Sequence, residues 1–145
     1  MIEVGGKEVT DREATAEGVV RMSTDSCERL IAGTPKGDPL EAARVAGLMA
    51  VKRTSELLPF CHPVAVTGAE VTVESQPQAG QVRIRASVRA RDRTGVEMEA
   101  LTACAVAALS VYDTVKAYEP TALIHRVVLL EKRGGKSGDF RPLDG

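Results

Sequence analysis

QVRIRASVRAR, from Gln81 to Arg91, alternates polar and apolar residues without a break. Strict period-two alternation is typical of a β-strand that turns one face to a core and the other to water. The run from Val64 to Glu74 is also rich in β-branched residues, and the turn-forming segment SQPQAG joins the two runs. The sequence therefore predicts an antiparallel hairpin made of strands 64–74 and 81–91.

The polar face of the second strand carries arginine at four positions, which raises the possibility of nucleic-acid binding. The neighbouring strand carries Glu70, Thr72 and Glu74 on its own polar face, and cross-strand Glu–Arg pairs would neutralise the arginines. Aromatic residues that would stack on bases are not interleaved with them. We therefore favour a solvated face. The four arginines are Arg83, Arg85, Arg89 and Arg91.

The rest of the chain supplies helices and two further strands. We expect a strand at 15–23, a short helix capped by Asp25 and ending near Gly33, and a helix that opens at Asp38 and Pro39 and runs to Leu58. After the hairpin come a long helix, 96 to about 118, closed by Pro120, and a strand at 126–131. This order predicts an α+β fold, a ferredoxin-like plait whose antiparallel sheet has its helices packed on one face. We expect residues 1–145 to form a single domain.

Composition sets bounds on the function. The chain has 43% hydrophobic and 27% charged residues, which is typical of a globular protein. Its net charge of −1 gives no reason to expect binding to nucleic acid or to an anionic membrane. Its three cysteines are far apart and form no CxxC pair, which indicates a reducing compartment. With two histidines, a metal site is not expected. We find no secretion signal and no segment of membrane-spanning length, so we expect a cytoplasmic protein.

The long helix is apolar almost all round between Ala100 and Val111. One small sheet cannot cover such a helix, so we expect a second subunit to cover the remainder. Asp113 and Lys116 follow this apolar stretch and are three residues apart, close enough to pair. Two interpretations are equally supported: a surface ion pair, and a proton-transfer pair whose pKa values are perturbed by burial.

Three other segments carry candidate ligand-binding residues. Lys36 lies between Pro35 and Gly37 in a loop that can aim the side chain, although a solvated loop lysine is the commoner case. His62, in PFCHP at 59–63, follows a helix end, where both a packing role and ligand contact are open. The GGKSG tail at 134–138 does not fit a P-loop, and either folds over an anion or forms a disordered terminus.

Four separated motifs together resemble the MoaC family, the cyclic pyranopterin monophosphate synthases of molybdenum cofactor biosynthesis. They are TPKGDPLEAARVAG at 34–47, PFCHP at 59–63, GVEMEAL at 95–101 and YDTVKA at 112–117. The resemblance implies a lyase that converts 3',8-cyclo-7,8-dihydroguanosine 5'-triphosphate to cyclic pyranopterin monophosphate and pyrophosphate. It implies no cofactor of its own, a substrate supplied by an upstream radical enzyme, and a homohexamer built as a trimer of dimers.

The resemblance also assigns roles to residues of this chain. The catalytic residues would be Lys36, Asp113 and Lys116. The substrate contacts would be Phe60, Cys61, His62, Met98 and Glu99, and the anion-binding residues Lys7, Arg12 and Lys132. The opening MIEVGGK departs from the family's usual pattern at Glu3 and Gly5, which weakens the assignment of Lys7, and Phe60 stands where leucine is usual.

From these roles we expect Lys116, with a lowered pKa, to donate a proton while Asp113 orients it. Mg²⁺ could arrive with the triphosphate. We also expect Lys36 and Lys116 of one active site to come from different subunits. The alternative from another functional class is a non-catalytic binder of nucleotides or pterins, since a plait alone implies no activity. A paired acid and base favours the enzyme, because binding alone does not need them.

Overall fold

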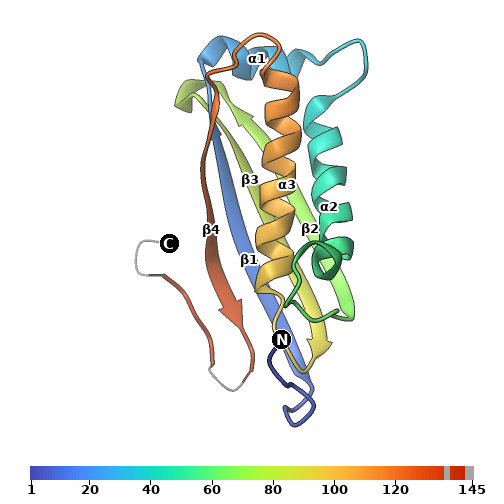
Figure 1. The fold of residues 1–145 in the computed structure, drawn as a ribbon. Helices are drawn as coiled ribbons and strands as arrows, with labels where there is room; N and C mark the ends of the chain where they lie inside the picture. The colour runs from blue at the N-terminus through green and yellow to red at the C-terminus, as the bar shows by residue number, and fades with distance from the viewer. Residues whose placement is uncertain (136–137, 143–145) are drawn as a thin grey trace.

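The computed structural model describes residues 1–135 and 138–142, which form an antiparallel sheet with helices packed on one face (Figure 1). The strand order β2-β3-β1-β4 is that of a ferredoxin-like plait, so the predicted α+β fold is confirmed. Along the chain the elements are β1 Thr10–Arg21, α1 Thr24–Ala32, α2 Pro39–Leu57, β2 Val66–Gln76, the 3-10 turn Pro77–Ala79, β3 Gln81–Asp92, α3 Glu97–Val115 and β4 Leu123–Arg133.

The hairpin lies where the alternating pattern predicts it. β2 pairs antiparallel with β3 from Val66↔Ala90 to Gln76↔Gln81. Gly80 closes the turn with a φ of +65°, a left-handed conformation that favours glycine. The predicted first strand begins and ends two residues too early, because the turn tightens around Pro77 rather than at Ser75.

β1 and β4 are longer than predicted. β1 begins at Thr10 rather than Thr15, and it pairs with β3 from Thr10 onward and with β4 from Glu13 onward. From Glu13 onward β1 has backbone partners on both sides, so a charged residue such as Glu13 is tolerated on its outer face. β4 likewise extends from Leu123 to Arg133 beyond the predicted 126–131.

Two helix caps show how local chemistry sets the boundaries. The Asp38 carboxylate accepts hydrogen bonds from the backbone N–H of Leu40 (2.9 Å) and of Glu41 (3.3 Å), as the Asp38–Pro39 pair predicts. The predicted cap at Asp25 was wrong. Ser23 caps α1 by accepting from the N–H of Ser26 at 3.1 Å, and Asp25 lies within the first turn.

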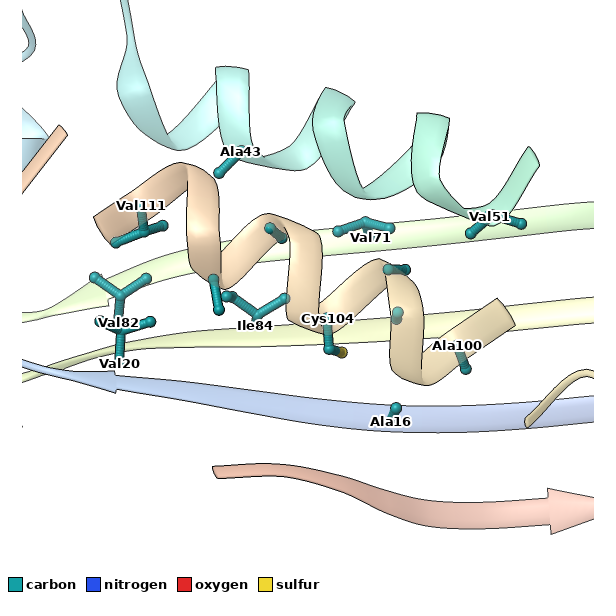
Figure 2. Packing of buried hydrophobic residues seen from close by; sticks show 14 of the residues in the cluster. Ala16, Val20, Ala43, Val51, Val71, Val82, Ile84, Ala100, Cys104 and Val111 are labelled. Carbon is teal, nitrogen blue, oxygen red and sulfur yellow. The ribbon is translucent and has the colours of Figure 1, made fainter. Parts of the chain in front are cut away.

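The core lies between α3, the sheet and α2 (Figure 2). Small residues on α3 let the layers approach closely, and a Cβ built on Gly47 of α2 would lie 3.2 Å from the carbonyl oxygen of Ala103. Close approach of α2 to α3 therefore depends on glycine at position 47. The buried residues of α3 include Ala100, Ala103, Cys104, Ala107, Ala108, Val111 and Val115.

α3 is 19 residues long, not the more than twenty expected, and ends at Val115. It is nevertheless long and apolar enough to cross a membrane by length and composition alone, so the expectation that no segment reaches this length was wrong. Its inner face packs in the core, which explains the apolar composition of that face. On the other side Leu109 is exposed, and the expectation that a second subunit covers this face stays a prediction.

Candidate functional site

A cavity of about 420 Å³ lies at the N-terminal end of α3. It is open to solvent, and its lining comes from the chain that follows α2, from the first turn of α3 and from the N-terminal segment. Six residues predicted to contact substrate line this cavity, although they are distant in sequence. They are Lys7, Phe60, Cys61, His62, Met98 and Glu99.

Glu99 is the most deeply buried charged side chain of the cavity, with only 3% of its surface exposed. Burial raises the pKa of its carboxyl group, and the nearby charge of Glu97 raises it further. Within the described part of the chain, Glu99 Oε1 has no hydrogen-bond partner, while Oε2 lies 3.9 Å from the Cys61 Sγ. A protonated Glu99 can therefore donate to a ligand in the cavity.

Cys61 is a thiol rather than a thiolate. Burial raises the pKa of Cys61, and the charges of Glu99 and Glu97 add to the effect. The thiol can contribute shape and a weak hydrogen bond to a ligand, but nothing here favours a nucleophilic role.

Arg12 and Lys132 lie beside the cavity rather than among the residues that line it. The buried Arg12 guanidinium donates to the backbone carbonyl oxygens of Asp92 (3.2 Å) and Arg93 (3.1 Å), so it fixes the corner between β3 and α3. Lys132 Nζ lies 3.1 Å from Glu97 Oε1. Glu97, which was not predicted as a site residue, therefore links β4 to the cavity. Its position two residues before Glu99 in GVEMEAL was the available signal.

Asp113 and Lys116 form an ion pair of 2.7 Å at the opposite end of α3, with side chains 74% and 54% exposed. The hydrogen bond from Lys116 lowers the pKa of Asp113, and the same contact raises the pKa of Lys116. The expectation that burial and neighbouring cations lower the pKa of Lys116 was therefore wrong for this chain, because the pair is exposed and each partner stabilises the charge of the other.

Lys36 belongs to the same end of the molecule. Its loop is closed by backbone hydrogen bonds between Thr34 and Gly37, and Gly37 has a φ of +121° that favours glycine. Lys116 is the main cause of the lowered pKa of Asp113, and the charge of Lys36 adds to it. The expectation that Lys36 and Lys116 of one site come from different subunits stays a prediction, and the competing model is that one chain supplies both lysines beside Asp113.

One chain thus separates the predicted site residues into two groups. The cavity group lies at the start of α3, and the Lys36–Asp113–Lys116 group, which we call the lysine pair site, lies at its end (Figure 1). Glu99 and Lys116 are seventeen positions apart, or about 25 Å along a helix. No single small ligand can contact both groups of the same chain.

No cluster of three or more potential metal-ligating side chains occurs within residues 1–135 and 138–142. The expectation that the protein has no metal and no cofactor stays a prediction.

Lys136 and Ser137 of the GGKSG tail lie outside the described residues. Gly135 packs against Arg12, because a Cβ there would overlap the guanidinium Nη1.

The raised pKa of Glu99 makes stability depend on pH in a way that a Glu99→Gln variant should remove. Above the ordinary pKa of 4.5, the unfolded state loses this proton before the folded state does, so the free energy of unfolding falls as pH rises through this range. Urea unfolding from pH 4.5 to 8 should show a smaller fall for Glu99→Gln than for the wild type. Parallel curves would mean that Glu99 titrates normally.

A comparison with known families adds an independent finding. Residues 1–135 of this 145-residue chain match the family model described as MoaC family. The match covers every helix and strand of the fold, and it includes all the residues of the cavity and of the lysine pair site.

Proposed function

The chain belongs to the MoaC family, whose members are enzymes of molybdenum cofactor biosynthesis, and from this premise we propose its reaction. The substrate is 3',8-cyclo-7,8-dihydroguanosine 5'-triphosphate, and the products are cyclic pyranopterin monophosphate and pyrophosphate, which makes the enzyme a phosphorus–oxygen lyase of the cytoplasm. Five residues of the family motifs and the basic residue Lys7 line one cavity, and this observation carries the proposal.

The ring rearrangement needs a proton donor and a proton acceptor on opposite sides of the C–N bond that opens. Asp113, with its lowered pKa, is ionised at neutral pH and suits the acceptor. Glu99, with its raised pKa, holds a proton more readily than an exposed glutamate and suits a donor. Two carboxyl groups whose environments push their pKa values apart are a common basis for acid–base pairs.

Lys116 and Lys36 supply positive charge next to Asp113. While Lys116 is paired with Asp113 its pKa is raised, so the ammonium group holds its proton. A substrate that separates the two groups removes this stabilisation and makes Lys116 a better donor. On this proposal the pKa of Lys116 falls only once substrate has bound.

Formation of the cyclic phosphate requires a ribose hydroxyl to attack the α-phosphorus while pyrophosphate leaves. Positive charge close to the leaving group stabilises the transition state. We assign this role to Lys7, which lines the cavity, and to Lys132 beside it, while Arg12 holds the adjacent corner of the backbone. Mg²⁺ bound to the triphosphate would contribute in the same way.

A complete active site on this proposal contains the cavity of one subunit and the lysine pair site of another. Phe60 at the cavity is 77% exposed, and Met98 and Leu109 on α3 are exposed as well, so the helix side offers apolar surface to a partner. An antiparallel arrangement of two α3 helices would bring the start of one beside the end of the other. Three such dimers would give the expected hexamer.

Turnover of the upstream radical enzyme's product tests the proposal. Purified protein incubated with that product should release pyrophosphate and form a pterin that fluoresces after oxidation. Binding of the compound without release of pyrophosphate would instead support a non-catalytic pterin-binding protein.

His62→Ala should raise KM several-fold with a smaller effect on kcat, because the side chain lines the cavity. Steady-state kinetics on the same substrate provide the measurement. The matched control is His125→Ala, which removes the chain's other histidine from an exposed position on β4. Unchanged KM and kcat in the His62 variant would return this residue to a packing role.

A further inference from the structure

A polar pocket of about 330 Å³, separate from the cavity, lies on the face of the sheet opposite the helices. It is built by β1, β3 and β4, and its described lining includes four arginines: Arg21, Arg83, Arg85 and Arg126. We call these residues, together with Glu17, the arginine pocket. The cavity and the lysine pair site share no residue with it.

Strand register explains why these side chains meet. Val19 on β1 faces Arg83 of β3 on one side and Arg126 of β4 on the other. Two residues earlier, on the same face of the strand, Glu17 faces Arg85. Arginines that are 43 positions apart in sequence therefore reach a single carboxylate.

Glu17 organises the pocket. Its Oε1 accepts a hydrogen bond of 2.5 Å from Arg83 Nε and lies 3.6 Å from Arg85 Nε, and its Oε2 accepts from Arg126 Nη2. Burial alone would raise the pKa of Glu17, but the hydrogen bonds from Arg83 and Arg126 outweigh it and hold the pKa below the usual value. Glu17 is thus ionised, and its contacts with the three arginines fix the directions of their guanidinium groups.

The arginines retain hydrogen-bonding capacity beyond Glu17. Arg83 and Arg126 each use one N–H on this carboxylate, whereas a guanidinium group carries five N–H donors. The side chains of Arg83, Arg85 and Arg126 are 36%, 50% and 45% exposed, but the Glu17 side chain is only 5% exposed. An approaching anion therefore meets guanidinium groups first, while the carboxylate lies beneath them.

We propose that the arginine pocket binds a phosphate-bearing anion, at a site separate from the candidate active site. Planar guanidinium groups bind phosphate oxygens through paired hydrogen bonds, and the four that line this pocket outnumber its one carboxylate, which leaves an excess of positive charge. The expected pairing of the arginine face with β2 holds only in part. Arg89 pairs with Glu70 at 3.3 Å, but Arg83 and Arg85 turn to Glu17 of β1 instead.

Isothermal titration calorimetry with pyrophosphate tests this site. The full-length protein with Lys7→Ala and Lys116→Ala, which weaken the candidate active site, should still bind pyrophosphate. Adding Arg85→Gln and Arg126→Gln should weaken that binding by about tenfold or more, because two charge-assisted contacts are lost while Arg83 still pairs with Glu17. Arg91→Gln is the matched control, since Arg91 lies on the same strand face but pairs with Asp11.

Equal affinity with and without the Arg85→Gln and Arg126→Gln changes would overturn the proposal, as would a failure of the wild-type protein to bind pyrophosphate. Amide shifts of the unmutated protein give a readout that does not depend on folding of the variants. Pyrophosphate should shift Gly18 and Val19 on β1, and no change there would also count against the site. Guanosine without phosphate should not bind to the pocket, and tight binding of guanosine would exclude phosphate as the recognised group.

Discussion

Replacing Lys116 with alanine should abolish turnover and leave the fold intact. The side chain is more than half exposed and its ion pair with Asp113 lies on the surface, so its loss should change the free energy of unfolding very little. A positioned proton donor contributes about 10²- to 10⁴-fold to the rate, so kcat should fall by about 10²-fold or more. Lys36→Ala should behave in the same way, because Lys36 supplies the second positive charge near Asp113.

Steady-state rates and melting temperatures, measured together, distinguish a catalytic role of Lys116 from a structural role. Lys52→Ala, an exposed lysine on α2 that lines neither candidate group, is the matched control and should keep wild-type activity. A large fall in melting temperature alongside lost activity would mean that Lys116 has a structural role. If Lys36→Ala kept more than about a tenth of the activity, a loss below ~1.4 kcal/mol, its catalytic role would be wrong.

Mixing two inactive variants should restore activity when their changes lie at opposite ends of α3. In a mixed pair of Lys116→Ala and Glu99→Gln subunits, one site receives the intact lysine pair site together with an intact cavity, and the other site receives neither. Half of randomly formed pairs are mixed, so activity should approach roughly a quarter of the wild-type value. The measurement is turnover after co-refolding, with subunit exchange followed by native mass spectrometry of differently tagged chains.

The contrasting mixture combines Lys36→Ala with Lys116→Ala. If one chain supplies both lysines beside Asp113, every site in this mixture lacks one of them, and no activity should return. If this mixture recovered activity and the first did not, the grouping of the residues described above would be wrong. Recovery in neither mixture, with exchange confirmed, would mean that each site is built within one chain.

Local sequence determined much of the fold. The alternation from Gln81 to Arg91 predicted β3 because a strand turns successive side chains to opposite faces. Asp38 before Pro39 predicted the start of α2. The Asp38 carboxylate accepts hydrogen bonds from free N–H groups of the first turn, and proline has no N–H that needs a partner. The motifs around His62 and Glu99 predicted substrate contacts, and both residues line the cavity, while their contact with substrate stays a prediction. Each of these inferences needs only a short segment of chain.

Tertiary structure decided everything that depends on which distant segments meet. Glu17 became the partner of Arg83, Arg85 and Arg126 because β1 lies between β3 and β4, and the pattern of a single strand does not reveal its neighbours. The pKa of Lys116 is raised rather than lowered because its ammonium group donates a hydrogen bond to Asp113 at an exposed end of α3. The alternation of polar and apolar residues can be read from adjacent positions in the sequence. Burial and charge pairing depend instead on how the whole chain packs.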